Sequence, residues 1–475
     1  MSEEIKFGTD GWRGIIAKDF TFDNVNLVAG AIALYINRRG LSDKGVVVGY
    51  DKRFLSEQFA ESTAEVLARH GIPVFLSDKP VPTPVAAYAI KVYDTAGAVM
   101  ITASHNPPYY NGMKYIPEYA GPALPHITGE IEENLKKIIS KSDRGIYFKG
   151  KHILGKHIIK RFNIDEIYLE HIKQLIPFDD MRKVKLKVII DPMYGAGIGY
   201  LKNLFDDLGW SAREINNKDD PLFGGNLPEP TSDRLTTLRE WVIKTNAAFG
   251  LALDGDADRF GVIDSDGSYI SSNQVLYILL NYLINRKGLR GPVCRTVATT
   301  HMLDVIAEKY GMNIIETPVG FKYIGECLFK ERAILGGEES GGLSIIGHIP
   351  EKDGILANAL MAGVSVLEGK SFKDIINDIK SVFGYKVSKR LDINCSREKK
   401  QEILDKMTTF KPDKLIDKKV VETITIDGLK HVMEDGSWCL VRPSGTEALF
   451  RIYAEAGDIA EVEGIQNEVR DSLGL

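Results

Sequence analysis

The sequence predicts an α/β protein in which three similar α/β domains are followed by a smaller α+β domain. The first observation is length, because 475 residues are too many for one hydrophobic core and suggest three or four domains. The second is a repeated pattern: a short β-branched run leads into an amphipathic segment of helix length three times before Tyr385. Alternation of this kind is typical of α/β architecture.

Each repeat contains an apolar run that we expect to be an early strand of its domain, followed by a turn and a helix-like segment. These runs lie at residues 46–51, 186–191 and 293–297. The C-terminal segment differs, because it has strand-like runs at 420–426 and 439–441 before a helix-like stretch from Ile459. It therefore predicts the smaller α+β domain.

Local composition marks the predicted boundaries. A glycine- and lysine-rich stretch at 145–160 precedes the first, the turn signal Asp266-Gly267 marks the second, and the third lies near Gly384. The predicted domains are residues 1–160, 161–266, 267–384 and 385–475.

Composition excludes several classes of protein. Hydrophobic residues at 44% and charged residues at 26% are ordinary for a soluble globular protein. No window of about 18 apolar residues is present, and the N-terminus is acidic, so we expect neither a membrane span nor a signal peptide but a cytoplasmic location. A net charge of −5 argues against a nucleic-acid partner. Four cysteines without a CxxC pair predict free thiols.

Residues 102–107 read Thr-Ala-Ser-His-Asn-Pro, a composition that by itself favours a turn. The serine is Ser104, and a serine hydroxyl needs a base, a metal or prior phosphorylation for phosphoryl chemistry. About 150 residues later, Asp254, Asp256 and Asp258 follow the apolar run at 251–253. Carboxylates at every second position past a strand end can turn toward one hard cation, and Mg²⁺ prefers such oxygen ligands. Together the two motifs predict a phosphoserine and its metal.

The three aspartates could also belong to an EF-hand loop or to a phosphatase-type site. An EF-hand loop requires glycine and glutamate where this chain has Arg259 and Ser265. A phosphatase-type site would make Asp254 itself the phosphoryl carrier, but it leaves the serine motif without a role. A separate glycine-containing run at 191–200 has Tyr200 where a dinucleotide loop needs its third glycine, so we expect only a helix-opening turn there.

Two further motifs complete the pattern. Residues 336–342 read Gly-Gly-Glu-Glu-Ser-Gly-Gly, and residues 442–447 read Arg-Pro-Ser-Gly-Thr-Glu. With the serine and aspartate motifs they stand in the order and approximate spacing found in the α-D-phosphohexomutases. The chain resembles this family, which includes phosphoglucomutase, phosphomannomutase and phosphoglucosamine mutase, over nearly its whole length from Phe7 to beyond Arg451.

The resemblance implies roles for individual residues. Ser104 would carry the phosphoryl group, and it would bind Mg²⁺ together with the three aspartates. Arg13, His105 and Arg259 match active-site positions of the family. Lys114 matches a lysine that is a candidate general acid or base, and a basic role would require its pKa to be lowered by burial or nearby cations.

The last two motifs imply substrate contacts. Glu338 and Ser340 resemble the family's pair that hydrogen-bonds two adjacent sugar hydroxyls. Lys322 is either an additional cation of the site or a solvated lysine. The expected substrate-phosphate loop consists of Arg442, Ser444, Gly445 and Thr446. Because position 442 is far from Ser104 in sequence, the domains are expected to close around a central cleft.

Subfamily features favour a phosphoglucomutase. Residues 347–354 and the run ending at Lys322 resemble that subfamily, whereas phosphoglucosamine mutases tend to carry a histidine where this chain has Gly342. A glycine cannot take over the acid/base role of that histidine, so Lys114 or His348 would have to act as the acid or base.

The implied activity is interconversion of glucose 1-phosphate and glucose 6-phosphate through a phosphoserine and a hexose 1,6-bisphosphate, which would also act as activator. Phosphomannomutase or dual activity is the alternative, because a pocket that binds the 3- and 4-hydroxyls says little about C2. A catalytically silent sugar-phosphate-binding protein is a third possibility, although Ser104, the aspartates and Lys114 are all present. The sequence does not predict an oligomeric state.

Overall fold

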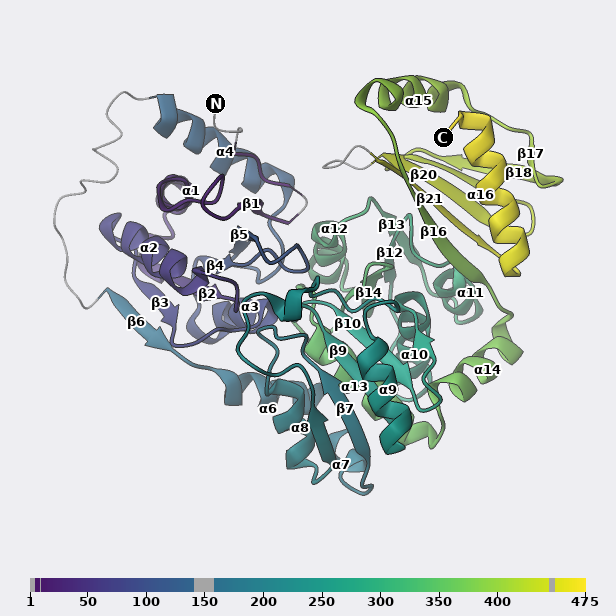
Figure 1. The fold of residues 1–475 in the computed structure, drawn as a ribbon, viewed down its shortest axis with the longest axis horizontal. Coiled ribbons are helices and arrows are strands. Elements are labelled where there is room, and N and C mark those ends of the chain that lie inside the picture. Colours follow the sequence, from purple (N-terminus) through teal and green to yellow (C-terminus); the bar gives the residue numbers. More distant parts are fainter. Residues whose placement is uncertain (1–4, 9, 141–157, 444–448) are drawn as a thin grey trace.

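The computed structural model describes residues 5–8, 10–140, 158–443 and 449–475. Four β-sheets follow one another along the chain, and we refer to the parts that carry them as domains 1 to 4 (Figure 1). The sheets of domains 1 to 3 are each accompanied by several helices. The C-terminal sheet is antiparallel, and its domain contains fewer helices. The predicted fold class, three α/β domains followed by an α+β domain, is confirmed.

Domain 1 is built on a six-stranded sheet with the strand order β1-β5-β4-β2-β3-β6. Its strands are β1 (Trp12–Ile15), β2 (Val46–Tyr50), β3 (Val74–Ser77), β4 (Gly97–Ile101), β5 (Tyr110–Pro117) and β6 (Ile159–Phe162). Its helices are α1 (Phe22–Arg38), α2 (Ser56–Arg69), α3 (Thr83–Tyr93), α4 (Pro125–Ser140) and the short η1 (Ser42–Lys44). β2 pairs in parallel with β3 and β4 and is buried throughout, which explains its uninterrupted apolar sequence.

Domain 2 has a five-stranded sheet with the order β11-β10-β9-β7-β8. Its strands are β7 (Lys187–Asp191), β8 (Ser211–Glu214), β9 (Phe249–Leu253), β10 (Phe260–Asp264) and β11 (Tyr269–Ile270). Its helices are α6 (Asp165–Leu175), α7 (Phe178–Met181), α8 (Tyr200–Asp207), α9 (Thr236–Thr245) and η2 (Phe223–Gly225). β9 and β10 form an antiparallel pair, and the predicted metal loop connects them.

Domain 3 has a four-stranded sheet with the order β13-β12-β14-β15. Its strands are β12 (Val293–Thr296), β13 (Ile314–Thr317), β14 (Leu335–Glu338) and β15 (Gly342–Ile345). Its helices are α10 (Ser272–Asn285), α11 (Met302–Lys309), α12 (Phe321–Glu326), η3 (Cys327–Glu331), α13 (Gly354–Glu368) and α14 (Phe372–Phe383). The glycine-rich motif forms the turn between β14 and β15.

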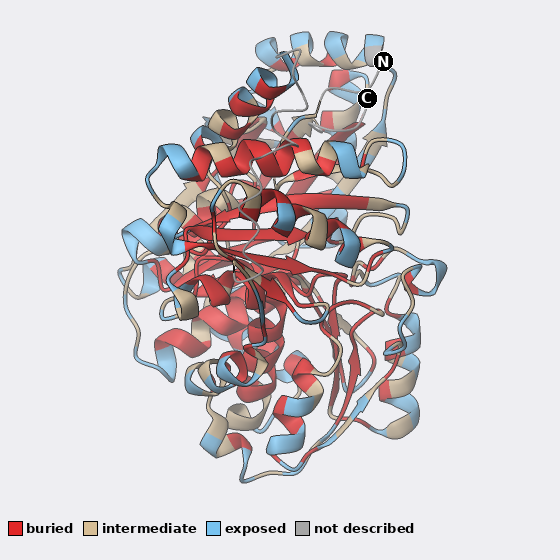
Figure 2. Cartoon of the chain, turned by 90° about the vertical axis from the view of Figure 1, so that its left-hand side faces the viewer, coloured by how far each residue is buried: buried red, intermediate tan, exposed pale blue. Residues whose placement is uncertain are grey.

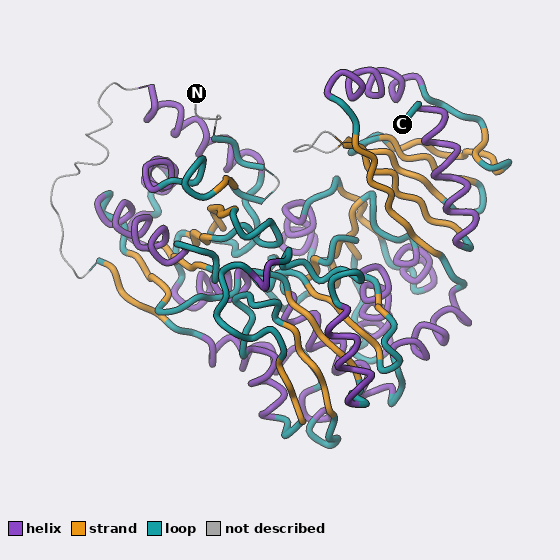
Figure 3. Tube along the Cα trace, viewed as in Figure 1, coloured by secondary structure: helices purple, strands orange, loops and turns teal. Residues whose placement is uncertain are grey.

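Domain 4 has a six-stranded sheet with the order β16-β21-β20-β19-β18-β17. Its strands are β16 (Val387–Asn394), β17 (Lys414–Leu415), β18 (Lys418–Ile424), β19 (Leu429–Met433), β20 (Trp438–Pro443) and β21 (Leu449–Ala456). Its helices are α15 (Arg397–Thr409) and α16 (Ile459–Leu473). Figure 3 shows these two helices beside the sheet, at a distance from domain 1.

The first three domains share a hydrophobic core. One cluster of buried side chains joins residues of sheets 1, 2 and 3, and buried segments run without interruption through the middle of the molecule (Figure 2). α13 is apolar on nearly all sides and packs against β10 of domain 2 as well as β15 of domain 3. The predicted boundary at residue 160 lies inside β6, and β11 extends sheet 2 beyond residue 266. Loops of these three domains lie together at the centre of the molecule (Figure 3).

A buried lysine connects domain 4 to domain 3. Nζ of Lys430 lies 2.9 Å from the carbonyl oxygen of Val297, 2.7 Å from Oε1 of Glu316 and 2.8 Å from Nε2 of His301. Burial lowers the pKa of Lys430 to about 8 and lowers the pKa of His301, so the imidazole is neutral and accepts the bond. Lys430 lies on β19 and pairs with Leu440 of β20, so these bonds hold the sheet that carries Arg442 against domain 3.

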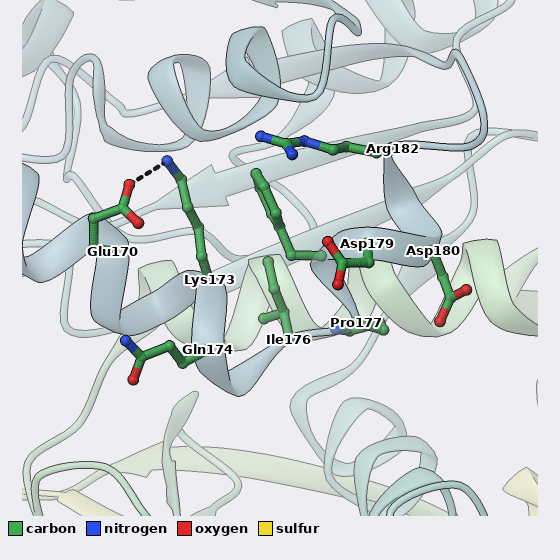
Figure 4. A pocket seen from close by; sticks show the side chains of 9 residues that line it. Glu170, Lys173, Gln174, Ile176, Pro177, Asp179, Asp180 and Arg182 are labelled. Carbon is green, nitrogen blue, oxygen red and sulfur yellow. Dashed lines mark hydrogen bonds and ion pairs between the residues drawn. The ribbon is translucent and has the colours of Figure 1, made fainter.

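One cavity lies well outside the predicted site. It has a volume of about 570 Å³ and is formed by α6 and α7 (Figure 4). Nζ of Lys173 lies 5.3 Å and the guanidinium carbon of Arg182 lies 4.9 Å from the ring centre of Phe178. The residues that line it include none of the predicted site residues that the structure describes. Among the residues placed by the structure, no helix combines the length and apolarity that crossing a bilayer requires.

Candidate active site

Ser104 lies in the loop between β4 and β5, with a left-handed backbone (φ 50°) and only 2% of its surface exposed. Its Oγ donates a hydrogen bond of 2.8 Å to Oδ2 of Asp254, and it lies 3.3 Å from Nδ1 of His105. The serine motif of domain 1 and the aspartate motif of domain 2 are therefore in direct contact, although 150 residues separate them.

The three aspartates of the β9–β10 loop form a compact acidic cluster. All three are buried, and they can present carboxylate oxygens that lie within 4.8 Å of one another. Oδ1 of Asp256 and Oδ1 of Asp258 are buried without a hydrogen-bond partner. Burial and the two neighbouring carboxylates raise the pKa of Asp254 well above its usual range. Buried, unpartnered carboxylate oxygens close together are the donor set that a small divalent cation requires, so these residues fit Mg²⁺.

Lys114 extends from β5 into the same cluster. Its Nζ lies 2.9 Å from Oδ2 of Asp10 and 3.0 Å from Oδ2 of both Asp256 and Asp258. Burial by itself would lower the pKa of Lys114, but the three carboxylates raise it well above its usual range. The lysine is therefore a firmly protonated cation here, and its surroundings do not produce the lowered pKa that a general base would need.

A second buried lysine, which the sequence interpretation did not assign to the site, completes the cluster. Nζ of Lys352 lies 3.1 Å from Oδ2 of Asp10, 3.3 Å from Oδ2 of Asp258 and 3.5 Å from Oε1 of Glu351. Burial raises the pKa of Glu351 to about 7. Glu351 and Lys352 belong to the run at 347–354 that resembles the phosphoglucomutases, and this motif membership was the available signal for a role in the site.

The other predicted residues of domains 1 and 2 surround Ser104. Arg13, on β1, donates a hydrogen bond from Nη1 to Oδ1 of Asn106. Burial lowers the pKa of His105 well below its usual range, and Arg259 and Arg13 lower it further, so the imidazole is neutral. The backbone N–H of Arg259 donates to Oδ1 of Asp254 (3.0 Å), and its Nη1 donates to Oε1 of Glu229 (3.2 Å).

Glu338 of the predicted sugar-binding pair in domain 3 lies within the electrostatic reach of Lys352 and Arg259. Glu338 ends β14 and is buried, and burial raises its pKa even though Lys352 and Arg259 act to lower it. Ser340 follows in the turn between β14 and β15, two positions after Glu338. Gly342 begins β15 directly beneath Lys352, because a Cβ atom at this glycine would lie 2.6 Å from Cδ of the lysine. Lys352 thus fills the space that a side chain at position 342 would need.

The predicted phosphate contacts are only partly described. Arg442 lies at the end of β20, and its Nε donates a hydrogen bond of 2.8 Å to Asp427, whose carboxylate also accepts from the backbone N–H of Val319 in domain 3 (3.0 Å). Lys322 lies in the first turn of α12 and is half-buried. Burial lowers its pKa, although the negative charge of Asp10 acts to raise it. Ser444, Gly445 and Thr446 lie outside the described residues.

His348 does not join the cluster around Ser104. Its Nε2 lies 2.8 Å from Oδ2 of Asp353, and its Nδ1 lies 3.0 Å from Nε2 of His171 on α6. Both His348 and Asp353 have buried side chains, and Asp353 also caps α13. His348 therefore connects domain 3 to domain 2. Its contacts do not favour a role as the acid or base of the site.

Comparisons with known proteins identify the family of the chain. Models of α/β/α domains I, II and III and of the C-terminal domain of phosphoglucomutase/phosphomannomutase match residues 4–142, 166–267, 271–382 and 393–472, respectively. The chain belongs to the phosphoglucomutase/phosphomannomutase family.

Individual relatives of this phosphohexomutase carry different names. A phosphoglucomutase/phosphomannomutase of Thermococcus kodakarensis is 30% identical over 451 residues, covering 95% of this chain and 94% of the relative. A probable phosphoglucosamine mutase of Pyrococcus abyssi is 32% identical over 473 residues, covering 98% of each. The solved structure of a putative phosphomannomutase from Thermus thermophilus matches with a TM-score of 0.85 at 32% identity, covering 100% of both chains. The protein is thus an enzyme, an intramolecular phosphotransferase.

Proposed function

We propose that this phosphohexomutase interconverts glucose 1-phosphate and glucose 6-phosphate, with Ser104 as the phosphoryl carrier. The observation that supports this proposal best is the 2.8 Å hydrogen bond from Oγ of Ser104 to Asp254, which places a hydroxyl beside three buried aspartates. The phosphatase-type alternative, with Asp254 as carrier, would leave this hydroxyl blocking the carboxylate oxygen that has to attack.

The acidic cluster supports Mg²⁺ as the cofactor. Asp254, Asp256 and Asp258 would hold it together with an oxygen on Ser104, and the unpartnered oxygens on Asp256 and Asp258 are free to do so. When bound, Mg²⁺ would offset the negative charge that develops on the phosphoryl group during transfer. Phosphorylation of Ser104 removes the hydrogen that Oγ now donates, and this frees Oδ2 of Asp254 as a further ligand.

The side chains of the cluster have distinct tasks in the proposed reaction. Phosphorylated Ser104 donates its phosphoryl group to the free hydroxyl of the sugar, which gives a hexose 1,6-bisphosphate. Lys114 and Lys352 hold positive charge beside the transferring group, and Lys114 keeps its proton on Nζ between three carboxylates. Much of the rate enhancement then comes from holding the reacting oxygens in position.

The bisphosphate then turns over in the site and returns its other phosphate to Ser104. Glu338 and Ser340 would bind the same two hydroxyls in both orientations, because a carboxylate accepts and a hydroxyl both donates and accepts. Arg442 would hold whichever phosphate is not being transferred. Added hexose 1,6-bisphosphate is expected to activate the enzyme by restoring the phosphoserine, and we place the reaction in the cytoplasm.

Gly342 and Lys352 support a glucose rather than a glucosamine phosphate. The stem of Lys352 fills the space beside Gly342, so this site presents a fixed ammonium where phosphoglucosamine mutases tend to carry a histidine. A protonated 2-amino group would meet like charge if it approached this ammonium. Phosphomannomutase or dual activity is the second candidate. It is favoured by the names of two relatives, the phosphoglucomutase/phosphomannomutase of Thermococcus kodakarensis and the putative phosphomannomutase of Thermus thermophilus.

Two measurements test the proposal. Measuring kcat/KM on the 1-phosphates of glucose, mannose and glucosamine, with glucose 1,6-bisphosphate as activator, should give the highest value for glucose. Ser104→Ala should abolish mutase activity with an unchanged circular dichroism spectrum, and mass spectrometry should find phosphate on Ser104 of the wild type. Wild-type turnover by Ser104→Ala would refute the serine mechanism and return Asp254 as carrier.

A further inference from the structure

We propose that Asp51, Arg53 and Thr102 form a positioning unit that fixes the backbone of Ser104 and thereby aims its hydroxyl at Asp254. None of the three is a ligand of the acidic cluster or belongs to the reacting groups of the mechanism above. The inference rests on the proposed role of Ser104 as phosphoryl carrier, and it explains how a buried serine is kept in the conformation that this role requires.

The conformation of Ser104 needs support from its surroundings. A backbone φ of 50° is in the left-handed region, which residues with a side chain rarely occupy. Such a conformation persists only where neighbouring groups determine it, and it is commonly found at functional sites. In this chain the backbone N–H and the carbonyl oxygen of Ser104 are each held by a different side chain.

Thr102 holds the N–H. Its Oγ1 accepts a hydrogen bond of 2.9 Å from the backbone nitrogen of Ser104 and donates one of 2.6 Å to Oδ2 of Asp51. A hydroxyl has a single hydrogen, and because Asp51 takes it, a lone pair is left to face Ser104. The carboxylate of Asp51 is itself fixed, since its Oδ1 accepts from the backbone N–H of Arg53 (2.9 Å) and from Oγ of Ser56 (2.8 Å).

Arg53 holds the carbonyl oxygen. Its side chain is fully buried, and its Nε lies 3.2 Å from Oδ2 of Asp51. The two terminal nitrogens donate to three carbonyl oxygens of the loop, those of Ser104 (2.5 Å), Asn106 (2.7 Å) and Pro107 (2.8 Å), and to the carbonyl oxygen of Tyr110 at the start of β5 (3.0 Å). The ring of Phe223, from domain 2, lies 5.0 Å from the guanidinium carbon. A planar fork with several donors suits this arrangement, and a lysine could not replace it.

The two contacts predict a specific kinetic effect. They hold Ser104 by its main-chain atoms and leave Oγ for Asp254, so their loss would misplace the nucleophile without removing it. Substrate binding depends on Glu338, Ser340 and Arg442 and should be preserved. The rate of phosphoryl transfer should fall, because a displacement of about 1 Å at a reacting atom can cost roughly 100-fold.

Thr102→Val is the decisive variant, because valine has the shape of threonine but lacks the hydroxyl. We expect kcat to fall about 100-fold and KM to change by less than about twofold, since only the transfer step is impaired. Thr102→Ser keeps the hydroxyl and should restore most of kcat. Single-turnover transfer from the phosphorylated enzyme to glucose 1-phosphate should show the same contrast between the two variants.

Thr63→Val is the matched control. Thr63 is a fully buried threonine of α2 in the same domain, and its hydroxyl donates to the carbonyl oxygen of Phe59 (2.8 Å). Its loss should lower the thermal midpoint without changing kcat. If Thr102 were merely structural, Thr102→Val would behave in the same way, with a lower midpoint and wild-type kcat, and the inference would be overturned.

Arg53→Lys provides an independent test of the second contact. Lysine keeps the charge but cannot reach four carbonyl oxygens, so kcat should fall while KM is retained, and wild-type kcat would exclude Arg53 from the unit. These outcomes are separate from the proposed function. An inactive Ser104→Ala together with a fully active Thr102→Val would refute only the positioning unit, whereas an active Ser104→Ala would refute the carrier role itself.

Discussion

The carbonyl oxygen of Ser104 lies directly against the α-carbon of Gly255, so that a Cβ atom added to Gly255 would approach it to 2.6 Å. Gly255 stands between the first two aspartates of the β9–β10 loop, and its own N–H donates to the carbonyl oxygen of Pro228 (3.2 Å). The backbone of the loop that carries Ser104 and the backbone of the β9–β10 loop are therefore packed together, so that a shift of one would displace the other.

Gly255→Ala should separate the two loops. The contact is with backbone, which cannot turn aside like a flexible side chain, and a displacement of about 1 Å is expected to reduce kcat by roughly 100-fold. Steady-state kinetics and Mg²⁺ titration of the variant would measure both consequences. Gly129→Ala, at a glycine of α4 with open space around it, is the control and should be fully active. Wild-type kcat for Gly255→Ala would contradict the coupling of the loops.

Removal of Mg²⁺ should abolish turnover, and Asp256→Asn should weaken Mg²⁺ binding. Oδ2 of Asp256 accepts hydrogen bonds from Thr83 (2.6 Å) and Lys114 (3.0 Å), whereas Oδ1 is unpartnered. An asparagine has one oxygen, and if that oxygen serves the two donors, the amide nitrogen faces the cation. Activity titrated against free Mg²⁺ after chelation would measure the shift. Asp94→Asn, on the surface, should leave the titration unchanged, and full activity in metal-free buffer would exclude the metal site.

Gly342→Ala should impair catalysis through Lys352. The added Cβ would lie 2.6 Å from Cδ of a lysine whose Nζ is held by Asp10 and Asp258, so the lysine must leave these partners. We expect kcat/KM to fall about tenfold, the typical scale for losing one charged contact. Lys352→Met should cause a similar loss, and the double variant should be no worse than the worse single variant. Fully additive losses would show that the glycine acts independently of the lysine.

Arg442→Ala should impair both directions of the reaction. If the guanidinium holds the phosphate that is not being transferred, its loss removes a charge-assisted contact of about 1.5 to 3 kcal/mol, a decrease of roughly 10- to 150-fold in kcat/KM. Arg442→Lys should be intermediate, because lysine keeps the charge without the planar fork. Kinetics with glucose 1-phosphate and with glucose 6-phosphate would measure this, and a defect in only one direction would argue against a shared phosphate site.

The stability of the enzyme should respond to titration of Asp191 at the end of β7. Burial raises the pKa of Asp191 to about 6, despite hydrogen bonds from the N–H of Met193 and from Asn216. A carboxyl whose pKa is raised by folding stabilises the fold fully below its unfolded pKa of about 3.9, and this stabilisation is lost as the pH rises through about 6.

Asp191→Asn should therefore gain stability relative to the wild type between pH 4 and pH 7, by at most about 3 kcal/mol. Urea unfolding midpoints of both proteins across this range would measure the difference. A difference that does not vary with pH would show that Asp191 has an ordinary pKa in the folded protein.

Local sequence was sufficient for the parts of the enzyme that short-range patterns encode. The strands β2, β7 and β12 lie where short runs rich in β-branched residues predicted them. Of these three strands, β2 is buried along its whole length and has no charged residue, as expected for a strand covered on both faces. The alternate spacing of the aspartates past β9 predicted that their carboxylates would turn toward one point, and their oxygens do lie within 4.8 Å of one another.

Only the tertiary structure decided which charges meet and in which protonation state. Lys352 is 238 positions after Lys114, yet both lie on Asp10 and Asp258, and the pKa of Lys114 is raised because three carboxylates from two domains surround it. His348 has the residue type of a catalytic acid or base, but packing directs it to His171. Electrostatic environments depend on distances between segments that are remote in sequence, and these distances exist only once the domains have packed together.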